Sequence, residues 1–122
     1  MRRFGLAILL VAVLAMPASA VLTGPVVVDC DLFAKETVTV GSTATSLTRA
    51  TWAPSAAPAA QCAILTVEAD SIRWYADGST ADSSGHLAVV NDVIVLKKTR
   101  QIANFSAIRV TGDSTVRVSY GR

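Results

Sequence analysis

The sequence predicts an all-β protein: a single-domain antiparallel β-sandwich of the jelly-roll or immunoglobulin-like kind, preceded by a signal-like hydrophobic helix. Short segments of alternating polar and apolar residues recur about every 8–12 residues, which is typical of sandwiches and barrels. Turn residues separate these segments, and after the leader no segment keeps the apolar period of a helix. A chain of 122 residues is long enough for one such domain.

The leader, residues 1–20, has the features of a secretory signal peptide. Arg2 and Arg3 give it a positive start, and residues 4–15 are uncharged and almost wholly apolar. Residues 18–20, Ala-Ser-Ala, match the small-residue pattern that signal peptidase accepts. We therefore expect the leader to be cleaved after residue 20.

A membrane anchor is the competing interpretation of the leader. A spanning helix needs about 20 consecutive apolar residues, whereas this apolar run ends at Pro17. The β-sandwich domain is therefore predicted to comprise residues 21–122, and the protein is expected to meet a membrane only through the leader during export.

Cys30 and Cys62 form an even pair in a chain that we expect to be exported. Exported proteins meet an oxidising environment, so the pair predicts one disulfide. The alternative is two free thiols buried as small apolar groups.

The first half of the domain begins with the β-branched run Val26–Val28, followed by residues 36–40, which alternate polar and apolar and predict a strand. Residues 43–51 are rich in Thr, Ser and Ala and could hold another strand. Residues 53–60 contain two prolines and predict a loop, because proline cannot donate to a strand ladder.

The second half predicts further strands and turns. Residues 63–68 and 71–75 are strand-like, and the polar segment 76–85 predicts a loop. Residues 102–105 predict a short strand or a turn. Two hairpins are expected: residues 86–90 with 93–97 around Asn91-Asp92, and residues 107–111 with 115–120 around Gly112–Ser114.

The same alternation predicts which side chains fill the core, since every second residue of a strand faces the same side. The predicted core residues are Val38, Val40, Ile64 or Leu65, Val67, Ile72, Trp74, Leu87, Val89, Ile108, Val110, Val116 and Val118.

Composition excludes several function classes. Eleven basic residues face nine acidic ones, and two of the basic residues lie in the leader, so the remaining chain is nearly neutral. A neutral domain lacks the electrostatic footprint for nucleic acid or anionic lipid. One histidine and two cysteines exclude sites with several ligands of these types.

The residues that could support catalysis do not form a recognisable motif. His86 lies near Ser83 and Ser84, and Asp82 and Asp92 flank it, but the chain has no Gly-x-Ser-x-Gly elbow. We therefore expect a protein that is not an enzyme, with no catalytic or cofactor-binding residues.

Two carboxylate pairs could support acid–base chemistry or metal binding. Glu68 and Asp70 would share one face of a strand by parity. Asp77 and Asp82 bracket a hydroxyl-rich loop that could offer oxygens to Ca²⁺, but its spacing does not match an EF-hand. We expect no metal site; the loop is better explained by Asx-turns.

Arg73 and Tyr75 form the candidate contact face. If Ile72 and Trp74 face the core, Arg73 and Tyr75 face outward on the same strand. An exposed tyrosine and arginine could stack on a sugar or anchor a protein partner.

Five segments carry a resemblance to known proteins: Ala63–Glu68, Ile72–Thr80, Gly85–Leu87, Ile102–Arg109 and Val116–Tyr120. In these segments the chain resembles small β-rich structural or accessory proteins of tailed bacteriophages and prophages. The resemblance implies a non-enzymatic β-sandwich that serves as a virion-associated accessory or decoration protein. Its partners would be other protein subunits, in a homo-oligomer or in a capsid or tail lattice.

The leader and the cysteine pair support an alternative function. Virion proteins of tailed phages are assembled in the cytoplasm, where disulfides are rare. The chain could instead be a secreted or periplasmic binding module that recognises a surface glycan or an envelope protein. The localisation is secreted or periplasmic if the leader is cleaved, and the virion otherwise.

Overall fold

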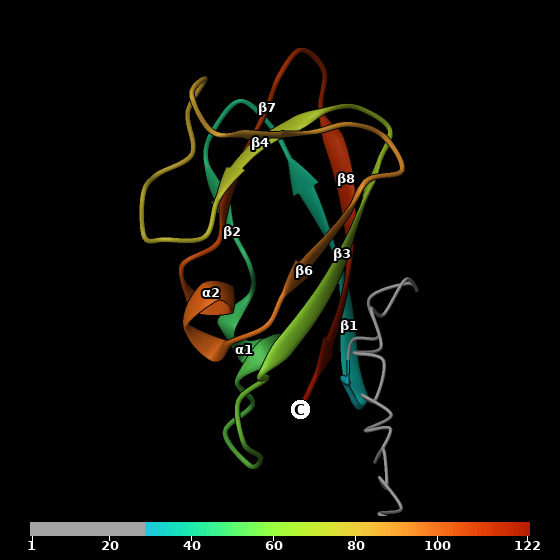
Figure 1. Ribbon diagram of the computed structural model, residues 1–122, viewed down its shortest axis with the longest axis vertical. Helices are drawn as coiled ribbons and strands as arrows, with labels where there is room; N and C mark the ends of the chain where they lie inside the picture. The colour runs from blue at the N-terminus through green and yellow to red at the C-terminus, as the bar shows by residue number, and fades with distance from the viewer. Residues whose placement is uncertain (1–28) are drawn as a thin grey trace, which may run out of the picture.

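A computed structural model describes residues 29–122 (Figure 1). The predicted leader and the run Val26–Val28 lie outside these residues. The described part of the chain contains eight strands and two short helices. They are β1 (Leu32–Val40), β2 (Thr45–Ser46), α1 (Arg49–Trp52), β3 (Cys62–Glu68), β4 (Ile72–Tyr75), β5 (His86–Ala88), β6 (Val93–Leu96), α2 (Thr99–Ala103), β7 (Ser106–Arg109) and β8 (Ser114–Gly121).

The strands form two four-stranded antiparallel sheets, so the predicted all-β class is confirmed. Sheet I has the order β1-β8-β3-β6, and sheet II has the order β2-β7-β4-β5. Each strand of the first half pairs with its counterpart counted from the other end: β1 with β8, β2 with β7, β3 with β6 and β4 with β5. The two sheets lie against each other in a sandwich-like arrangement (Figure 1).

Both predicted hairpins are wrong. β5 belongs to sheet II and β6 to sheet I, and β7 and β8 are divided in the same way. The turns after β5 and β7 therefore carry the chain from one sheet to the other. At the first of these turns Asn91 has a φ of 74° and donates to Val67 O at 2.8 Å, so the entry to β6 is held against β3. Turn residues signal a reversal of direction but not which sheet the next strand joins.

Two segments fit their predictions only in part. The strand predicted within residues 43–51 is the two-residue β2, which α1 follows, and residues 102–105, predicted as a short strand or a turn, hold the end of α2 and a turn at Asn104. These helices have four and five residues, which is too short for an apolar period to be recognised. Each is anchored by one buried side chain, Trp52 in α1 and Ile102 in α2.

Most of the predicted core is confirmed. Val40, Leu65, Val67, Ile72, Val116 and Val118 are buried, and half-buried Val38 and Trp74 pack against them. Three predictions are wrong, because Leu87, Val89 and Val110 are 51%, 44% and 46% exposed. Ile108 is only half-buried.

The predicted Cys30–Cys62 disulfide is present and links Cys30, two residues before β1, to the start of β3. Gly121 of β8 is the register partner of Cys62. A Cβ atom on Gly121 would lie 2.9 Å from Cys62 Sγ and 2.8 Å from Asp31 O, and closer still to Cys30 Sγ. Only glycine therefore leaves room for the disulfide to cross this strand end.

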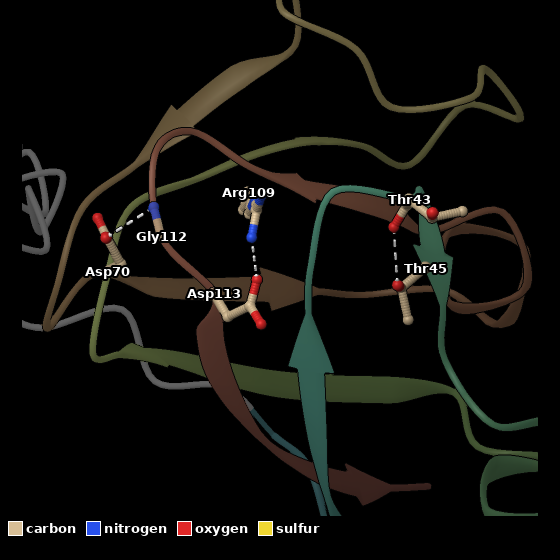
Figure 2. A network of polar contacts seen from close by, with 6 residues as sticks. All are labelled: Thr43, Thr45, Asp70, Arg109, Gly112 and Asp113. Carbon is tan, nitrogen blue, oxygen red and sulfur yellow. Dashed lines mark hydrogen bonds and ion pairs between the residues drawn. The ribbon is translucent and has the colours of Figure 1, made fainter.

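The connection between β3 and β4 is held by hydrogen bonds to the β7–β8 connection and to the start of β8. Ala69 has a φ of 76°, a left-handed conformation that disfavours residues with a Cβ. The Asp70 carboxylate accepts from Ser71 N–H at 2.7 Å. It also accepts from Gly112 N–H at 3.0 Å (Figure 2). The Ser114 hydroxyl lies 2.5 Å from Asp70 O. These contacts hold the turn in place despite the conformation of Ala69.

We expect Gly121→Ala to lower the free energy of unfolding by about 1–3 kcal/mol, the usual cost of overpacking. Chemical denaturation of the oxidised protein measures this decrease in the free energy of unfolding. The cost should shrink in a chain that carries Cys30→Ala and Cys62→Ala, because the sulfur atoms are then absent. Gly41→Ala is the control, since its new Cβ would meet Asp113 Oδ1 at an ordinary 3.6 Å. Equal costs in both backgrounds would contradict the packing argument.

Ala69→Gly is expected to raise the free energy of unfolding by roughly 0.5–1 kcal/mol. Relief of the left-handed alanine gains about 1–2 kcal/mol, and the greater freedom of glycine in the unfolded chain offsets part of it. The measurement is urea denaturation beside Ala103→Gly, an exposed helical position that should lose stability. A loss at both positions would show that Ala69 is not strained.

Candidate functional site

The outer face of sheet II carries aliphatic side chains around one arginine. Arg73 of β4 lies opposite Leu87 of β5 and Ile108 of β7. Residues directly opposite in neighbouring strands point to the same face. Because Ile72 is fully buried, its neighbour Arg73 and the two aliphatic partners of Arg73 face away from the core.

Two further valines extend this face. Val89 and Val110 directly follow β5 and β7, and Val110 N–H donates to Ser71 O at 3.2 Å. We call the set of Arg73, Tyr75, Leu87, Val89, Ile108 and Val110 the outer patch. It contains three of the six large exposed apolar side chains found among residues 29–122.

On β5 and β7 the smaller side chains face the core and the larger aliphatic ones face outward, which is unusual. On each strand the fully buried position is an alanine: Ala88 lies opposite Ile72 and Ala107 opposite Trp74, and they are 2% and 0% exposed. The other inward positions, His86 and Arg109, lie at the strand ends. The larger aliphatic residues of these strands face outward instead. Contiguous exposed apolar surface on a soluble domain usually marks a contact site. Sequence reasoning placed the larger residues in the core; the two alanines in alternation with them were the available signal.

The structure places the predicted contact residues Arg73 and Tyr75 against the end of the 76–85 loop. Arg73 Nη1 donates to Gly85 O at 3.2 Å. The Tyr75 hydroxyl donates to Ser84 Oγ at 3.2 Å. Gly85 itself lies close to β4, because an added Cβ would come within 3.0 Å of Trp74 N. The loop therefore fixes the position of both side chains and leaves each partly exposed.

Ser84 connects this arrangement to the loop carboxylate Asp82. Ser84 N–H and Oγ donate to Asp82 Oδ1 at 2.9 and 2.6 Å. These two hydrogen bonds, the side-chain bond first, lower the pKa of Asp82. Asp77 is held similarly: its Oδ1 accepts from Ser79 N–H at 2.9 Å, and the bonds to Ser79 lower the pKa of Asp77. Both carboxylates thus form Asx-turns, as expected.

His86 lies among aromatic rings. Its ring centroid is 5.2 Å from that of Trp74 and 6.0 Å from that of Tyr75. Of the acidic residues weighed as its partners, Asp82 binds Ser84, and Asp92 Oδ2 accepts from Val89 N–H at 2.9 Å. Within the described residues, no hydrogen bond joins His86 to either carboxylate or to Ser83 or Ser84.

A groove of about 380 Å³ lies between the edge strands β5 and β6. Trp74, Ala88 and Ile94 line it, and Val93 at its rim is 58% exposed. Leu87 lines this groove as well as belonging to the outer patch, so the groove adjoins the patch. The groove lining contains one carboxylate, that of Asp92, which already accepts the hydrogen bond from Val89 N–H.

The parity prediction for Glu68 and Asp70 is wrong, because β3 ends at Glu68 and Ala69 turns the chain. Glu68 Oε2 pairs with Arg117 Nε at 2.7 Å on sheet I, whereas Asp70 caps the neighbouring turn. Among residues 29–122 no three His, Cys, Asp or Glu side chains gather as a metal site would require. No helix in this range is long and apolar enough to span a membrane.

Tyr120 and Glu36 form a polar contact inside the sandwich that the sequence did not predict. The Tyr120 side chain is fully buried, and its hydroxyl donates to Glu36 Oε1. Glu36 Oε1 also accepts from Thr48 N–H at 3.1 Å, directly before α1. Burial, together with the Glu36 contact, raises the pKa of Tyr120 above its ordinary value of 10.0. The contact joins β1, β8 and α1.

No protein family, curated protein or solved structure matches this chain. The outer patch is therefore identified from its own geometry.

The raised pKa of Tyr120 gives a pH prediction. The protonated phenol stabilises the folded state below pH 10, and this stabilisation is lost as the pH rises above the unfolded-state pKa. The loss should reach about 1.4 kcal/mol at pH 11. Denaturation at pH 9 and pH 11 should therefore show a larger decrease for the natural chain than for Tyr120→Phe. Equal decreases would contradict the assignment.

Proposed function

We propose that this chain is a non-enzymatic structural or interaction module, most like an accessory or decoration protein of a phage virion, and that it binds another protein through the outer patch. The observation that carries the proposal is the outward position of the large aliphatic residues on β5 and β7. Alanines occupy their fully buried positions, Ala88 and Ala107, while Leu87 and Ile108 face outward. A domain that acted alone would gain nothing from large aliphatic side chains at outward positions, where polar residues serve as well.

The composition of the outer patch fits a protein contact. Leu87, Val89 and Val110 each keep about half of their surface exposed. Fully burying one such side chain is worth about 1.5–3 kcal/mol, so covering the exposed halves of three would contribute several kcal/mol. Tyrosine and arginine are, with tryptophan, the residues enriched at the centres of such contacts, and the patch contains Tyr75 and Arg73.

We further propose that the sandwich is a jelly roll rather than an immunoglobulin-like domain. Four antiparallel pairs, β1·β8, β2·β7, β3·β6 and β4·β5, are what results when one long two-stranded ribbon rolls up. An immunoglobulin-like domain would keep sequential strands such as its first two together in one sheet. Jelly rolls occur in viral capsid proteins and in lectins, which is an analogy of fold and not of function.

The alternative function is a secreted or periplasmic binding module for an envelope protein or a surface glycan. The Cys30–Cys62 disulfide favours it, because disulfides persist in oxidising compartments. The Trp74–His86–Tyr75 cluster beside the patch supports the glycan form of this alternative, since sugars stack on aromatic rings.

The experiment compares the natural chain with Leu87→Ser/Val110→Ser and with the control Val93→Ser, which is equally exposed but lies on β6 of sheet I. We expect the double variant to fold normally but to be absent from purified particles from the native source. The control should be present in them. Intact mass would show a full-length chain in those particles. An oxidised chain of residues 21–122, outside the cytoplasm and absent from particles, would contradict the virion function and favour the alternative.

A further inference from the structure

Arg73 is the one charged group among the outward positions of β4, β5 and β7. The other outward side chains of these strands are Tyr75, Leu87, Ser106 and Ile108. Arg73 is half-buried between Leu87 and Ile108, its register partners on either side. A partner that covers the patch would therefore remove the guanidinium from most of its remaining water.

The guanidinium is already oriented but is not saturated. It can donate five hydrogen bonds, and among the described residues it donates one, from Nη1 to Gly85 O at 3.2 Å. That bond comes from the loop end that also contacts Tyr75 through Ser84. The remaining donors lie in a position fixed before binding, which lowers the entropy that a partner must overcome.

An arginine that loses its water needs acceptors, and an unpaired one would be strongly unfavourable. A carboxylate is the acceptor in proteins that fits the planar guanidinium with two parallel hydrogen bonds. The aliphatic neighbours exclude water from such a pair and thereby strengthen it. The patch is thus complementary to one negative charge surrounded by apolar groups.

Two other occupants fit less well. A second copy that met the first across a two-fold axis would set the same patch against itself, and this would bring two Arg73 side chains together with no acidic outward residue to separate them. A polyanion needs several cations in one surface, and the outward positions of these strands supply one.

We propose that the partner of the outer patch is a different protein that places an aspartate or glutamate carboxylate, ringed by aliphatic side chains, against Arg73. This inference rests on the proposed function and specifies the chemistry of its contact. Arg73 determines which partner is accepted, and the aliphatic residues supply most of the buried area.

The test begins with a photo-crosslinking amino acid in place of Leu87, in the full chain expressed in its native source. Mass spectrometry of the cross-linked product identifies the partner segment. Binding of the purified partner is then measured for the natural chain, Arg73→Ala, Arg73→Lys and Arg73→Glu. Arg100→Glu on α2 is the control, because it makes the same charge change at an exposed residue outside the patch.

The proposal expects a cross-linked segment that contains Asp or Glu, and a loss of affinity of about 30-fold or more for Arg73→Ala. Arg73→Lys should lose less, Arg73→Glu should lose most, and Arg100→Glu should bind normally. Reversing the partner's carboxylate to arginine should restore binding to Arg73→Glu.

A cross-linked segment without a carboxylate, a cross-link to a second copy, or normal binding by Arg73→Glu would overturn the inference while leaving the patch as the contact surface. The absence of any cross-link from position 87 would overturn the proposed function itself, and the inference with it.

Discussion

The space between the two sheets at β4 is the constraint on which the candidate site depends. Trp74 points toward the core and stacks on Phe105 with ring centroids 5.9 Å apart, and Ile72 is fully buried beside it. Protein interiors are close-packed, so large side chains on one strand need small ones on its neighbours. Ala88 opposite Ile72 and Ala107 opposite Trp74 meet this need, while the other register partners, Arg109 and His86, lie at the ends of β7 and β5.

The outward position of the aliphatic residues follows from that packing. Strand residues alternate between faces, and a shift of one residue would exchange the two sets. If Leu87 or Ile108 pointed inward, it would overpack the space beside Trp74, and overpacking typically costs about 1–3 kcal/mol. The alanines therefore allow the core to pack closely, and the larger apolar side chains remain on the outer surface. The same four strand positions explain both the packing of the interior and the character of the outer patch.

The outer patch differs in character from the connections at the sheet ends. There, polar side chains bind backbone groups of neighbouring connections, as Asp70 does with Gly112, and Arg109 pairs with Asp113 at 2.5 Å (Figure 2). These groups satisfy one another and need no partner. At the patch, one arginine retains free donors among aliphatic side chains. The two surfaces differ in this way: the polar groups at the sheet ends bind one another, whereas the patch leaves aliphatic side chains and arginine donors exposed.

The sequence predicted the all-β class, the disulfide and most core residues, because period-two alternation and an even cysteine pair are local signals. It also identified Arg73 and Tyr75 as outward-facing. It failed where the outcome depends on tertiary packing. Turn residues at Asn91 and Gly112 could not reveal that the next strand changes sheets.

The sequence also predicted the wrong inward-facing residues on β5 and β7, since hydrophobicity alone favours Leu87 over Ala88 as the core residue. The left-handed Ala69 could not be foreseen either, because nothing in an alanine signals a turn.

The central claim is that Leu87, Val89 and Val110 face solvent while Ala88 and Ala107 face the core. The most direct measurement is methyl NMR with a soluble paramagnetic agent, which broadens exposed methyl groups and spares buried ones. The account predicts strong broadening for Leu87, Val89 and Val110, with Ala88, Ala107 and the buried Leu65 protected. Protection of Leu87 together with broadening of Ala88 would contradict it, because β5 would then face the opposite way.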